Sequence, residues 1–511
     1  MRPRFVLPGL ACLLALFTAG CSASPDRTGP AEPGATAAAA VVESPPPSAQ
    51  PLDSAAENAL PGTADWRITR RGRAEEIEGY ADRVSVLPGE AFRLHVSTTR
   101  RAFRAEAFRI GWYGGLGARR LWESAEVPAG RQPAAEVDPV TSTVSAPWKP
   151  SLTVPTDGWP AGSYLVRLTA TGGAQRYVPV TVRSAETTGR LVIVNATTTW
   201  QAYNKWGGHD LYGGPAGFSD RSRAVSFDRP YDTDGAKLFR LFELDAITVA
   251  ERQGRPLAYL TDNDLHSGAT PLTGARGLVT LGHDEYWSAA MWKNVERARD
   301  AGTNLAFLGA NAVNRHIRFA ATVLGEDRLV ICYKSEEDPI GRTDPSEVTV
   351  DWRIGSPPRP ESALIGVQYT CFPAEGAFTV TRPRNWLFKG TGVRKGQAFP
   401  GLVGPESDSI NIGGPTPRPL EVIAHSPIRC GTPGVSSSDA VYSTADSGAG
   451  VFASGTMRFV CGLRGTRCGH GVTDAAIPFV TRVLENLYAA FSDGPAGIPH
   501  PARDTLDQPL G

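Results

Sequence analysis

The sequence has no excess of either charge sign. Lys+Arg and Asp+Glu each count 52 among 511 residues, so the formal net charge is zero. Proteins that bind nucleic acids present a basic face or stripe, and this balance argues against a nucleic-acid partner. Hydrophobic residues make up 41% and charged residues 20%, which excludes wholesale disorder. The length predicts two or three domains.

Long hydrophobic runs are also scarce. The apolar run from Phe5 to Ala19 follows Arg2 and Arg4 and is shorter than the roughly 20 residues that span a bilayer. This pattern predicts a secretory signal peptide over residues 1–20. The run ends in FTAGC, which resembles a bacterial lipobox, so we expect lipidation of Cys21. The predicted location is the outer face of the cytoplasmic membrane, and a secreted protein is the alternative.

Large apolar side chains are rare over residues 21–65, which are rich in Ala, Pro, Ser, Gly and Thr. Such a segment cannot bury enough surface to offset its chain entropy. We therefore expect a flexible tether between the lipid anchor and the folded body.

Cysteine is sparse, and its spacing is not that of a zinc site. Beyond Cys21, five cysteines remain, at positions 332, 371, 430, 461 and 468. In an oxidising compartment they allow two disulfides and one free thiol. Cys461 and Cys468 are close enough to form one, while both Cys332–Cys371 and Cys371–Cys430 remain open for the other.

The sequence does contain much glycine and proline, 55 and 42 residues, which favours a protein rich in strands and loops. Residues 66–183 alternate with the period of a half-buried strand, for example in EAFRLHVS (90–97) and YLVRLTA (164–170). We therefore predict an immunoglobulin-like β-sandwich for this region.

The pattern changes in residues 190–493, where continuous apolar runs alternate with helical segments. The runs at 191–195, 277–281 and 304–308 predict strands buried on both faces, as in a parallel sheet. Helices are predicted over 236–252, after an N-cap at Ser288, and over 474–491. We expect an α/β domain with a β-rich insertion at about 331–424, followed by a loose tail over 494–511.

Two polar clusters directly follow predicted buried strands, where α/β sheets carry their sites. The first is TWQAYNKWGG (199–208) and the second is GHDEYW (282–287), in which His283 and Glu285 are two residues apart. Packing is the favoured interpretation of Trp200, Trp206 and Trp287, and Asp284 is also consistent with a helix N-terminus.

Several motifs resemble the large subunit of N,N-dimethylformamidase and its relatives. They are FRIGWYGG (108–115), WPAGSYLVRL (159–168), WQAYNKWGG (200–208), GHDEYWS (282–288) and FLGAN (307–311). The resemblance extends over roughly residues 77–491. It implies a β-sandwich beside an α/β body of the glutamine-amidotransferase-like type, a mononuclear iron held by two tyrosinates and one glutamate, and hydrolysis of a formamide C–N bond.

Carried onto this sequence, the resemblance implies Glu285, Tyr203 and Tyr164 as metal ligands. It also implies His283 as the active-site histidine and Glu421 as a further catalytic acid. Tyrosinate and carboxylate are hard anionic oxygen ligands that suit iron(III). Zinc is the alternative metal, although zinc sites more often use His or Cys.

We therefore predict an exported lipoprotein that hydrolyses the C–N bond of a small-molecule amide. Two other functions remain open. One is a non-catalytic envelope protein whose site has decayed, and the other is a different hydrolase, such as a glycosidase that uses His283, Glu285 and Asp262 or Asp264. The sequence leaves the substrate, the oligomeric state and the need for a small second subunit undecided.

Overall fold

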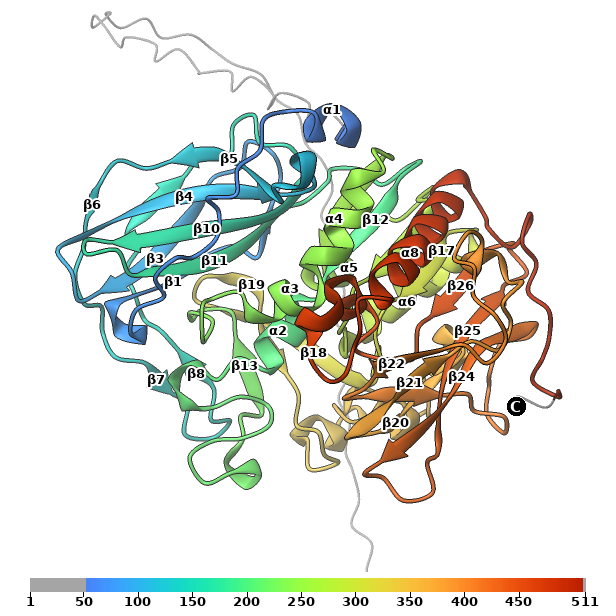
Figure 1. The fold of residues 1–511 in the computed structure, drawn as a ribbon. Helices are drawn as coiled ribbons and strands as arrows, with labels where there is room; N and C mark the ends of the chain where they lie inside the picture. The colour runs from blue at the N-terminus through green and yellow to red at the C-terminus, as the bar shows by residue number, and fades with distance from the viewer. Residues whose placement is uncertain (1–51, 509–511) are drawn as a thin grey trace, which may run out of the picture. The chain divides into compact units, whose positions relative to one another are not determined.

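The computed structural model describes residues 52–508. The predicted signal peptide, Cys21, the tether as far as residue 51 and residues 509–511 lie outside this range. The described part is a mixed α/β structure with many sheets and few helices (Figure 1). Within residues 52–508, none of the helices combines the length and the apolar character needed to cross a membrane.

Two mainly antiparallel sheets pack on a common apolar core in the N-terminal region, and only β2 runs parallel to its neighbour, β11. We call this region the sandwich. The smaller sheet has the order β1-β3-β9 and the larger one β2-β11-β10-β4-β5, with β6 paired to β4. The strand bounds are β1 Ile77–Ala81, β2 Ser85–Val86, β3 Phe92–Thr98, β4 Ala102–Ile110, β5 Ala118–Glu123, β6 Val127–Pro128, β9 Leu152–Val154, β10 Gly162–Ala170 and β11 Gln175–Val182. Alternate side chains of both sheets, among them Leu94 and Val166, are fully buried in this core.

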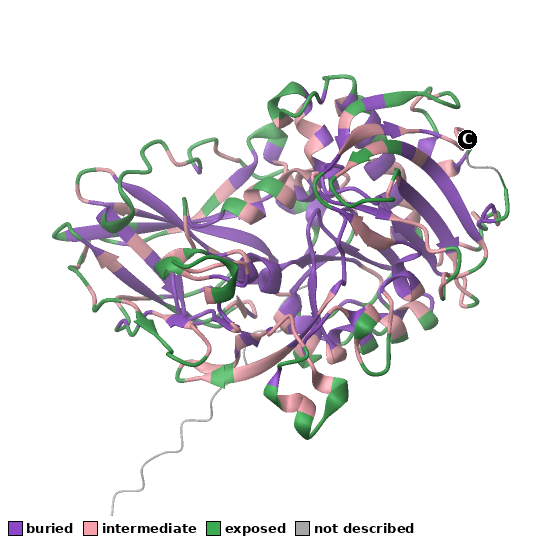
Figure 2. Ribbon diagram, turned by 90° about the horizontal axis from the view of Figure 1, so that it is seen from below, coloured by how far each residue is buried: buried purple, intermediate pink, exposed green. Residues whose placement is uncertain are grey.

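A nine-stranded sheet of order β14-β12-β15-β17-β26-β25-β24-β21-β22 forms the centre of the second region. Its strands are β12 Leu191–Asn195, β14 Leu257–Thr261, β15 Gly277–Thr280, β17 Asn304–Phe307, β21 Ala374–Thr379, β22 Ala398–Val403, β24 Leu420–Cys430, β25 Ser437–Thr444 and β26 Gly450–Ala453. The first five in spatial order are parallel and the rest are antiparallel. The structure thus confirms that the three apolar runs are neighbouring strands, and all their strand residues are buried. Figure 2 shows that much of the ribbon at the centre of the molecule is buried.

Helices cover both faces of this sheet because successive strand residues point to opposite sides. On one face, α4 (Leu244–Arg252) and α8 (Ala476–Asp493) pack on Ile193 and Val279. On the other face, α5 (Asp262–Ser267) and α6 (Ala289–Asp300) pack on Val192 and Leu278. Ser288 caps α6 as predicted, its hydroxyl accepting a hydrogen bond from the Met291 N–H at 3.3 Å.

A smaller four-stranded sheet lies beside the loops that follow the parallel strands. Its order is β13-β19-β18-β16, with bounds β13 Ala224–Ser226, β16 Tyr286–Ser288, β18 Arg315–Thr322 and β19 Gly325–Ile331. The remaining strands are β7 Glu136–Val137, β8 Val144–Ser145, β20 Gln368–Cys371 and β23 Ser407–Ser409. The remaining α-helices are α1 Ser54–Asn58, α2 Thr197–Ala202, α3 Lys237–Phe242 and α7 Ser362–Ile365.

Four sequence predictions about the fold require correction. The helix predicted over 236–252 is divided into α3 and α4, because the Phe242 carbonyl accepts a hydrogen bond from the Gly282 N–H. The predicted insertion is continuous with the main sheet through β21, β22 and β24. The predicted loose tail is ordered as far as residue 508, where the Thr505 N–H donates to the Leu420 carbonyl at 2.9 Å.

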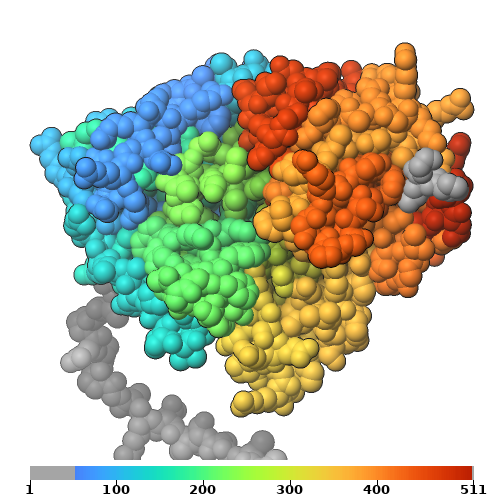
Figure 3. Space-filling model, turned by 60° about the horizontal axis from the view of Figure 1, so that its bottom comes forward, coloured from blue at the N-terminus to red at the C-terminus, as the bar shows by residue number. Residues whose placement is uncertain are grey.

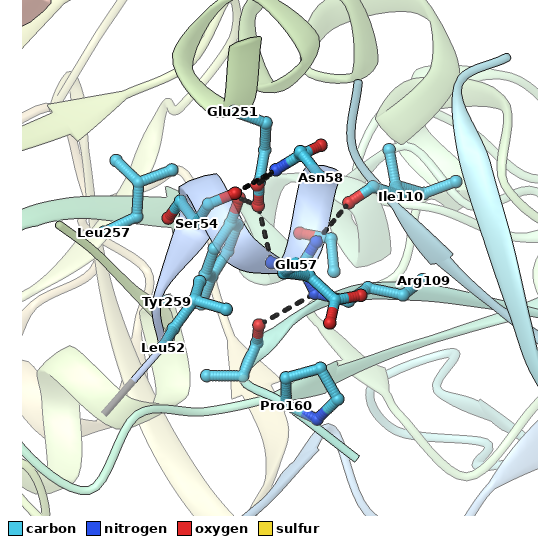
Figure 4. Close-up of polar contacts among 12 residues, drawn as sticks. Leu52, Ser54, Glu57, Asn58, Arg109, Ile110, Pro160, Glu251, Leu257 and Tyr259 are labelled. Atoms are coloured by element: carbon cyan, nitrogen blue, oxygen red, sulfur yellow. Dashed lines mark hydrogen bonds and ion pairs between the residues drawn. The ribbon is translucent and has the colours of Figure 1, made fainter. Parts of the chain in front are cut away.

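The predicted tether also ends earlier than residue 65. Residues 54–58 form α1, and the Asn58 amide bonds to Glu251 of α4 and accepts the Trp112 N–H at 2.7 Å (Figure 4). The segment is ordered because its polar side chains satisfy groups buried between the sandwich and the α/β region. Glu251 also forms an ion pair with Arg109 in this buried region. Their charged groups are 2.6 Å apart, and both side chains are fully buried.

Two disulfides join cysteines within the second region. Cys371 bonds to Cys430 and Cys461 to Cys468, with Cα–Cα distances of 5.8 and 5.6 Å. Both Cα–Cα distances lie in the usual range for disulfides. Cys332 is buried and free, which decides between the two alternatives that the sequence left open.

Candidate functional site

The two predicted polar clusters meet at one edge of the central sheet. Tyr203 follows α2, which begins just after β12, and Glu285 lies in the loop between β15 and β16. Because β12 and β15 are parallel neighbours, their carboxyl ends reach the same edge. Tyr203 and Glu285 therefore lie side by side, although 82 residues separate them in the sequence.

Tyr203 and Glu285 are in direct contact. The Tyr203 hydroxyl donates to Glu285 Oε2 at 2.7 Å. His283 Nε2 lies 3.8 Å from the same carboxylate oxygen. The structure therefore brings together three of the residues that the sequence singled out, while their chemical roles stay predictions.

Tyr164 does not converge on this point. It lies in β10 within the sandwich core, where its ring stacks on Trp159 at a centroid distance of 4.9 Å. Its hydroxyl donates to the Pro160 carbonyl at 2.7 Å. The predicted ligand role of Tyr164 is therefore wrong for this structure, because β10 holds the residue between β4 and β11.

Tyr212 contributes the third oxygen instead. Its hydroxyl lies 2.6 Å from the Tyr203 hydroxyl and 3.0 and 2.9 Å from the two Glu285 carboxylate oxygens. The Tyr203 and Tyr212 rings stack with their centroids 4.4 Å apart. The Tyr286 hydroxyl donates to that of Tyr212 at 2.7 Å. We call Tyr203, Tyr212 and Glu285 the three-oxygen cluster.

Main-chain contacts hold Glu285 in place. Its N–H donates to Thr199 Oγ1 at 3.0 Å, and its carbonyl accepts from the Arg315 N–H at 2.9 Å. The loop also passes very close to the strand end at Gly309, where a Cβ would lie 2.2 Å from the Gly282 carbonyl oxygen. Gly309 of FLGAN is thus required by this close approach, and Gly282 of GHDEYW by the Phe242 carbonyl oxygen, which a Cβ would meet at 2.8 Å.

Positive charges surround the Glu285 carboxylate, which is almost fully buried. Burial alone would raise the pKa of Glu285, but Lys334, His283 and Arg315 hold it below its ordinary value. Burial lowers the pKa of Lys334 to about 8. The Lys334 ammonium lies 3.3 Å from the centroid of the Tyr212 ring, a cation–π contact.

The loops that carry Tyr212 and Lys334 are neighbours. Arg221 Nη2 donates to the Tyr333 carbonyl at 2.9 Å. Figure 3 shows the segment around residues 205–230 (green) at the surface beside the segment around 330–350 (yellow). Both segments therefore border the region of the three-oxygen cluster.

Glu421 does not lie in the cluster. It accepts a hydrogen bond from the Asn385 amide at 3.1 Å, and burial raises its pKa. Glu406 is a second buried carboxyl, and burial and the charge of Glu285 raise its pKa well above the ordinary value. Its Oε2 is buried and has no hydrogen-bond partner among the described residues. Glu406, rather than Glu421, is therefore the carboxyl whose pKa responds to the charge of Glu285.

The other candidate residues have structural partners. The Trp287 indole N–H donates to Asp284 at 2.8 Å, and Trp287 is fully buried. Asp264 caps α5 by bonding to Thr261. Asp262 accepts the Thr198 hydroxyl at 2.6 Å. These contacts favour packing and capping as the roles of the four residues.

The three-oxygen cluster suits a hard cation by its donor chemistry. Its oxygens lie within 3.0 Å of one another, which is the spacing of ligands that share one ion at about 2 Å. Burial and the Glu285 charge raise the pKa of both tyrosines, so an ion here would replace their protons. Across residues 52–508, no group of three His, Cys, Asp or Glu side chains is placed to hold a metal, so a site here depends on tyrosine.

Periodic sequence patterns do not mark the additional residues Tyr212, Lys334 and Glu406. Tyr212 lies nine positions after Tyr203 in the glycine-rich segment GGHDLYGG, and this proximity is the one available clue. Lys334 and Glu406 lie in the predicted β-rich insertion at about 331–424. Only the packing of that region against the strand ends brings them close to Glu285.

Comparison with solved structures yields a weak likeness. The crystal structure of a Paenibacillus sp. cycloisomaltooligosaccharide glucanotransferase complexed with cycloisomaltoheptaose matches at 12% identity with a TM-score of 0.13. The match covers 25% of this chain and 17% of that chain. A likeness at this level does not indicate a common fold. No curated protein matches the chain.

A family model gives a much broader match. It is described as "N,N-dimethylformamidase beta subunit-like, C-terminal", and it matches residues 104–474. The matched range contains Tyr203, Tyr212, His283, Glu285 and Glu406 and extends over more than half of the 511 residues. The chain therefore belongs to the N,N-dimethylformamidase beta subunit-like family.

Proposed function

We propose that this protein hydrolyses the C–N bond of a small-molecule amide, with a mononuclear iron held by Tyr203, Tyr212 and Glu285. The observation that carries the proposal is the contact of two phenol oxygens with one buried carboxylate at 2.7–3.0 Å. Family membership supports the amide as substrate.

The proposed iron and the residues around the cluster have separate roles in the reaction. A bound iron would act as a Lewis acid that polarises the amide carbonyl and acidifies water. His283 would pass a proton to the departing amine, and the 3.8 Å between its Nε2 and Glu285 Oε2 supports this role. Glu406, whose Oε2 has no hydrogen-bond partner among the described residues, is the second acid–base candidate.

Metal content and colour test the ligand set. Tyr203→Phe and Tyr212→Phe each remove one oxygen with almost no change in volume. We expect both variants to lose bound iron, as measured by elemental analysis, and the visible absorption that tyrosinate–iron charge transfer produces. Tyr164→Phe is the matched control, because its hydroxyl bonds only to the Pro160 carbonyl. It should keep the iron and the colour.

Turnover tests the reaction. Release of amine from a formamide should follow the iron content across these variants and fall by at least a hundredfold in Tyr203→Phe and Tyr212→Phe. Wild-type iron and turnover in both variants would overturn the ligand assignment. A purified chain with neither metal nor turnover would favour the non-catalytic binding protein, and zinc in place of iron would correct the metal alone.

We also propose that the chain is exported and anchored to the outer face of the cytoplasmic membrane through Cys21. The two disulfides support an oxidising location, since disulfides are rare in reducing compartments. Labelling with a lipid precursor should mark the wild type and leave Cys21→Ala unmarked. Equal labelling of both would refute the anchor, and release of unlabelled protein into the medium would indicate a secreted form.

A further inference from the structure

A cavity of about 360 Å³ opens beside the three-oxygen cluster. It falls within the range of small-molecule pockets. Five of its lining residues are aromatic, Trp200, Tyr203, Tyr212, Tyr231 and Phe239, and Leu238 adds a further apolar side chain. The two tyrosines of the cluster therefore form part of the pocket wall. A ligand in the pocket contacts the rings whose hydroxyls touch Glu285.

The aromatic wall is held rigidly. The Trp200 ring meets Tyr231 and Phe239 edge to face, at centroid distances of 6.3 and 5.8 Å. Its indole N–H donates to Glu243 Oε1 at 2.7 Å, and Trp200 is 7% exposed. A wall fixed in this way keeps its shape without a ligand, so little ordering opposes binding.

The mouth of the pocket carries both charge signs. Lys205 and Lys237 are exposed, and Asp232 lies half-buried between the aromatic wall and solvent. Opposite charges at the rim do not select an ion of one sign. The lining also contains Asp210, a buried carboxyl that accepts the Tyr212 and Gly213 N–H groups at 2.8 and 2.7 Å. The selective element is therefore the aromatic part of the wall, which suits a flat, uncharged ring by stacking and edge contacts.

We propose that this pocket binds the aromatic ring of an aromatic amide and that such amides, rather than dimethylamides, are the preferred substrates. The inference rests on the proposed amide hydrolysis. Water adds its oxygen to the carbonyl carbon, the C–N bond breaks, and the nitrogen takes a proton, so that one acid and one amine leave. Two methyl groups fill little of a 360 Å³ cavity, whereas a ring contacts its walls.

The test compares formanilide and N,N-dimethylbenzamide with N,N-dimethylformamide. The wild type should show a kcat/KM at least tenfold higher for one aromatic amide than for dimethylformamide. The aromatic amide that is preferred tells on which side of the C–N bond the ring lies. Binding of the same compounds is measured by calorimetry, which does not require turnover.

Leu238→Trp fills the pocket, and Leu241→Trp is its matched control. Leu241 lies on the same helix, α3, but it is 38% exposed and does not line the cavity. We expect Leu238→Trp to weaken binding of the aromatic amide and its kcat/KM, relative to dimethylformamide, by tenfold or more. Leu241→Trp should leave this ratio at the wild-type value. Leu238→Ala, which enlarges the same cavity, should favour a naphthyl amide over formanilide.

The outcomes separate the pocket from the reaction. Calorimetric binding that Leu238→Trp removes, without turnover of any amide, would uphold the pocket and reject the proposed hydrolysis. Turnover of dimethylformamide with no preference for a ring, and no effect of Leu238→Trp or Leu238→Ala, would reject the pocket and leave the hydrolysis standing. Neither binding nor turnover would reject both.

Discussion

Glu251→Gln removes the negative partner of the most deeply buried ion pair between the sandwich and the α/β region. Glu251 Oε1 lies 2.6 Å from Arg109 Nη2, and both side chains have no exposed surface. Glutamine has nearly the same volume, so the substitution creates no cavity. It leaves the Arg109 guanidinium with the Ala161 carbonyl at 3.1 Å and the Tyr113 hydroxyl at 3.0 Å as uncharged acceptors.

The expected cost is large because a buried charge loses its counter-ion. Breaking such a pair from one side costs about 3–5 kcal/mol, whereas replacing both partners with apolar side chains is often nearly neutral. We therefore expect Glu251→Gln to lower the free energy of unfolding by about 3–5 kcal/mol. The double variant Arg109→Met/Glu251→Met should recover most of that loss. Figure 4 shows the two residues beside α1, whose Asn58 also contacts Glu251.

Urea unfolding followed by far-ultraviolet circular dichroism measures the effect. The matched control is Glu485→Gln. It removes the carboxylate that pairs with Arg252, in a partially exposed ion pair, and Arg252 follows Glu251 on α4. Surface pairs contribute about 0–1 kcal/mol, so this control should move the midpoint only slightly. A loss in Glu251→Gln no larger than that of the control would refute the reasoning. A double variant less stable than the single one would also refute it.

Three further predictions concern single side chains. Asn58→Ala leaves the Trp112 N–H without its 2.7 Å acceptor and should cost about 1–3 kcal/mol of unfolding free energy, measured by the same urea titration. Glu406→Gln should lower kcat for an amide by about a hundredfold or more, whereas Glu421→Gln, whose partner is Asn385, should change it less than threefold; the reverse order in steady-state assays would restore Glu421. The hydrogen bond to Asp439 raises the pKa of His425, so its stabilisation is complete below the ordinary value of about 6.5 and is lost as pH rises through the raised pKa. His425→Gln should therefore lower unfolding free energy more at pH 5.5 than at pH 9, and equal losses at both would contradict the ion pair.

The central sheet was predictable because burial on both faces leaves a continuous apolar run in the sequence. The runs at 191–195, 277–281 and 304–308 are β12, β15 and β17, and every residue of these strands is buried. Their shared orientation then fixes where the loops after β12 and β15 meet. Tyr203, His283 and Glu285 could be located from the sequence for this reason.

The two ends of the folded region were harder to predict from the sequence. Residues 52–65 resemble the low-complexity segment before them, yet α1 is held by long-range polar contacts with Glu251 and Trp112. Contacts between residues so far apart leave no local pattern. The same holds for the C-terminal residues up to 508, where Thr505 bonds to the β24 residue Leu420.

Tyr212, and not the predicted Tyr164, lies in the three-oxygen cluster because a strand fixes the direction of its side chains. A residue in the interior of the nine-residue β10 is fixed on one face of its sheet by hydrogen bonds to two neighbouring strands. Its hydroxyl can reach only what lies over that face, here the Pro160 carbonyl. Tyr212 lies in a loop between α2 and β13, where the backbone is free to approach the strand ends, and Asp210 fixes it by accepting the Tyr212 N–H at 2.8 Å. The three-oxygen cluster is therefore built from side chains at strand ends and in loops.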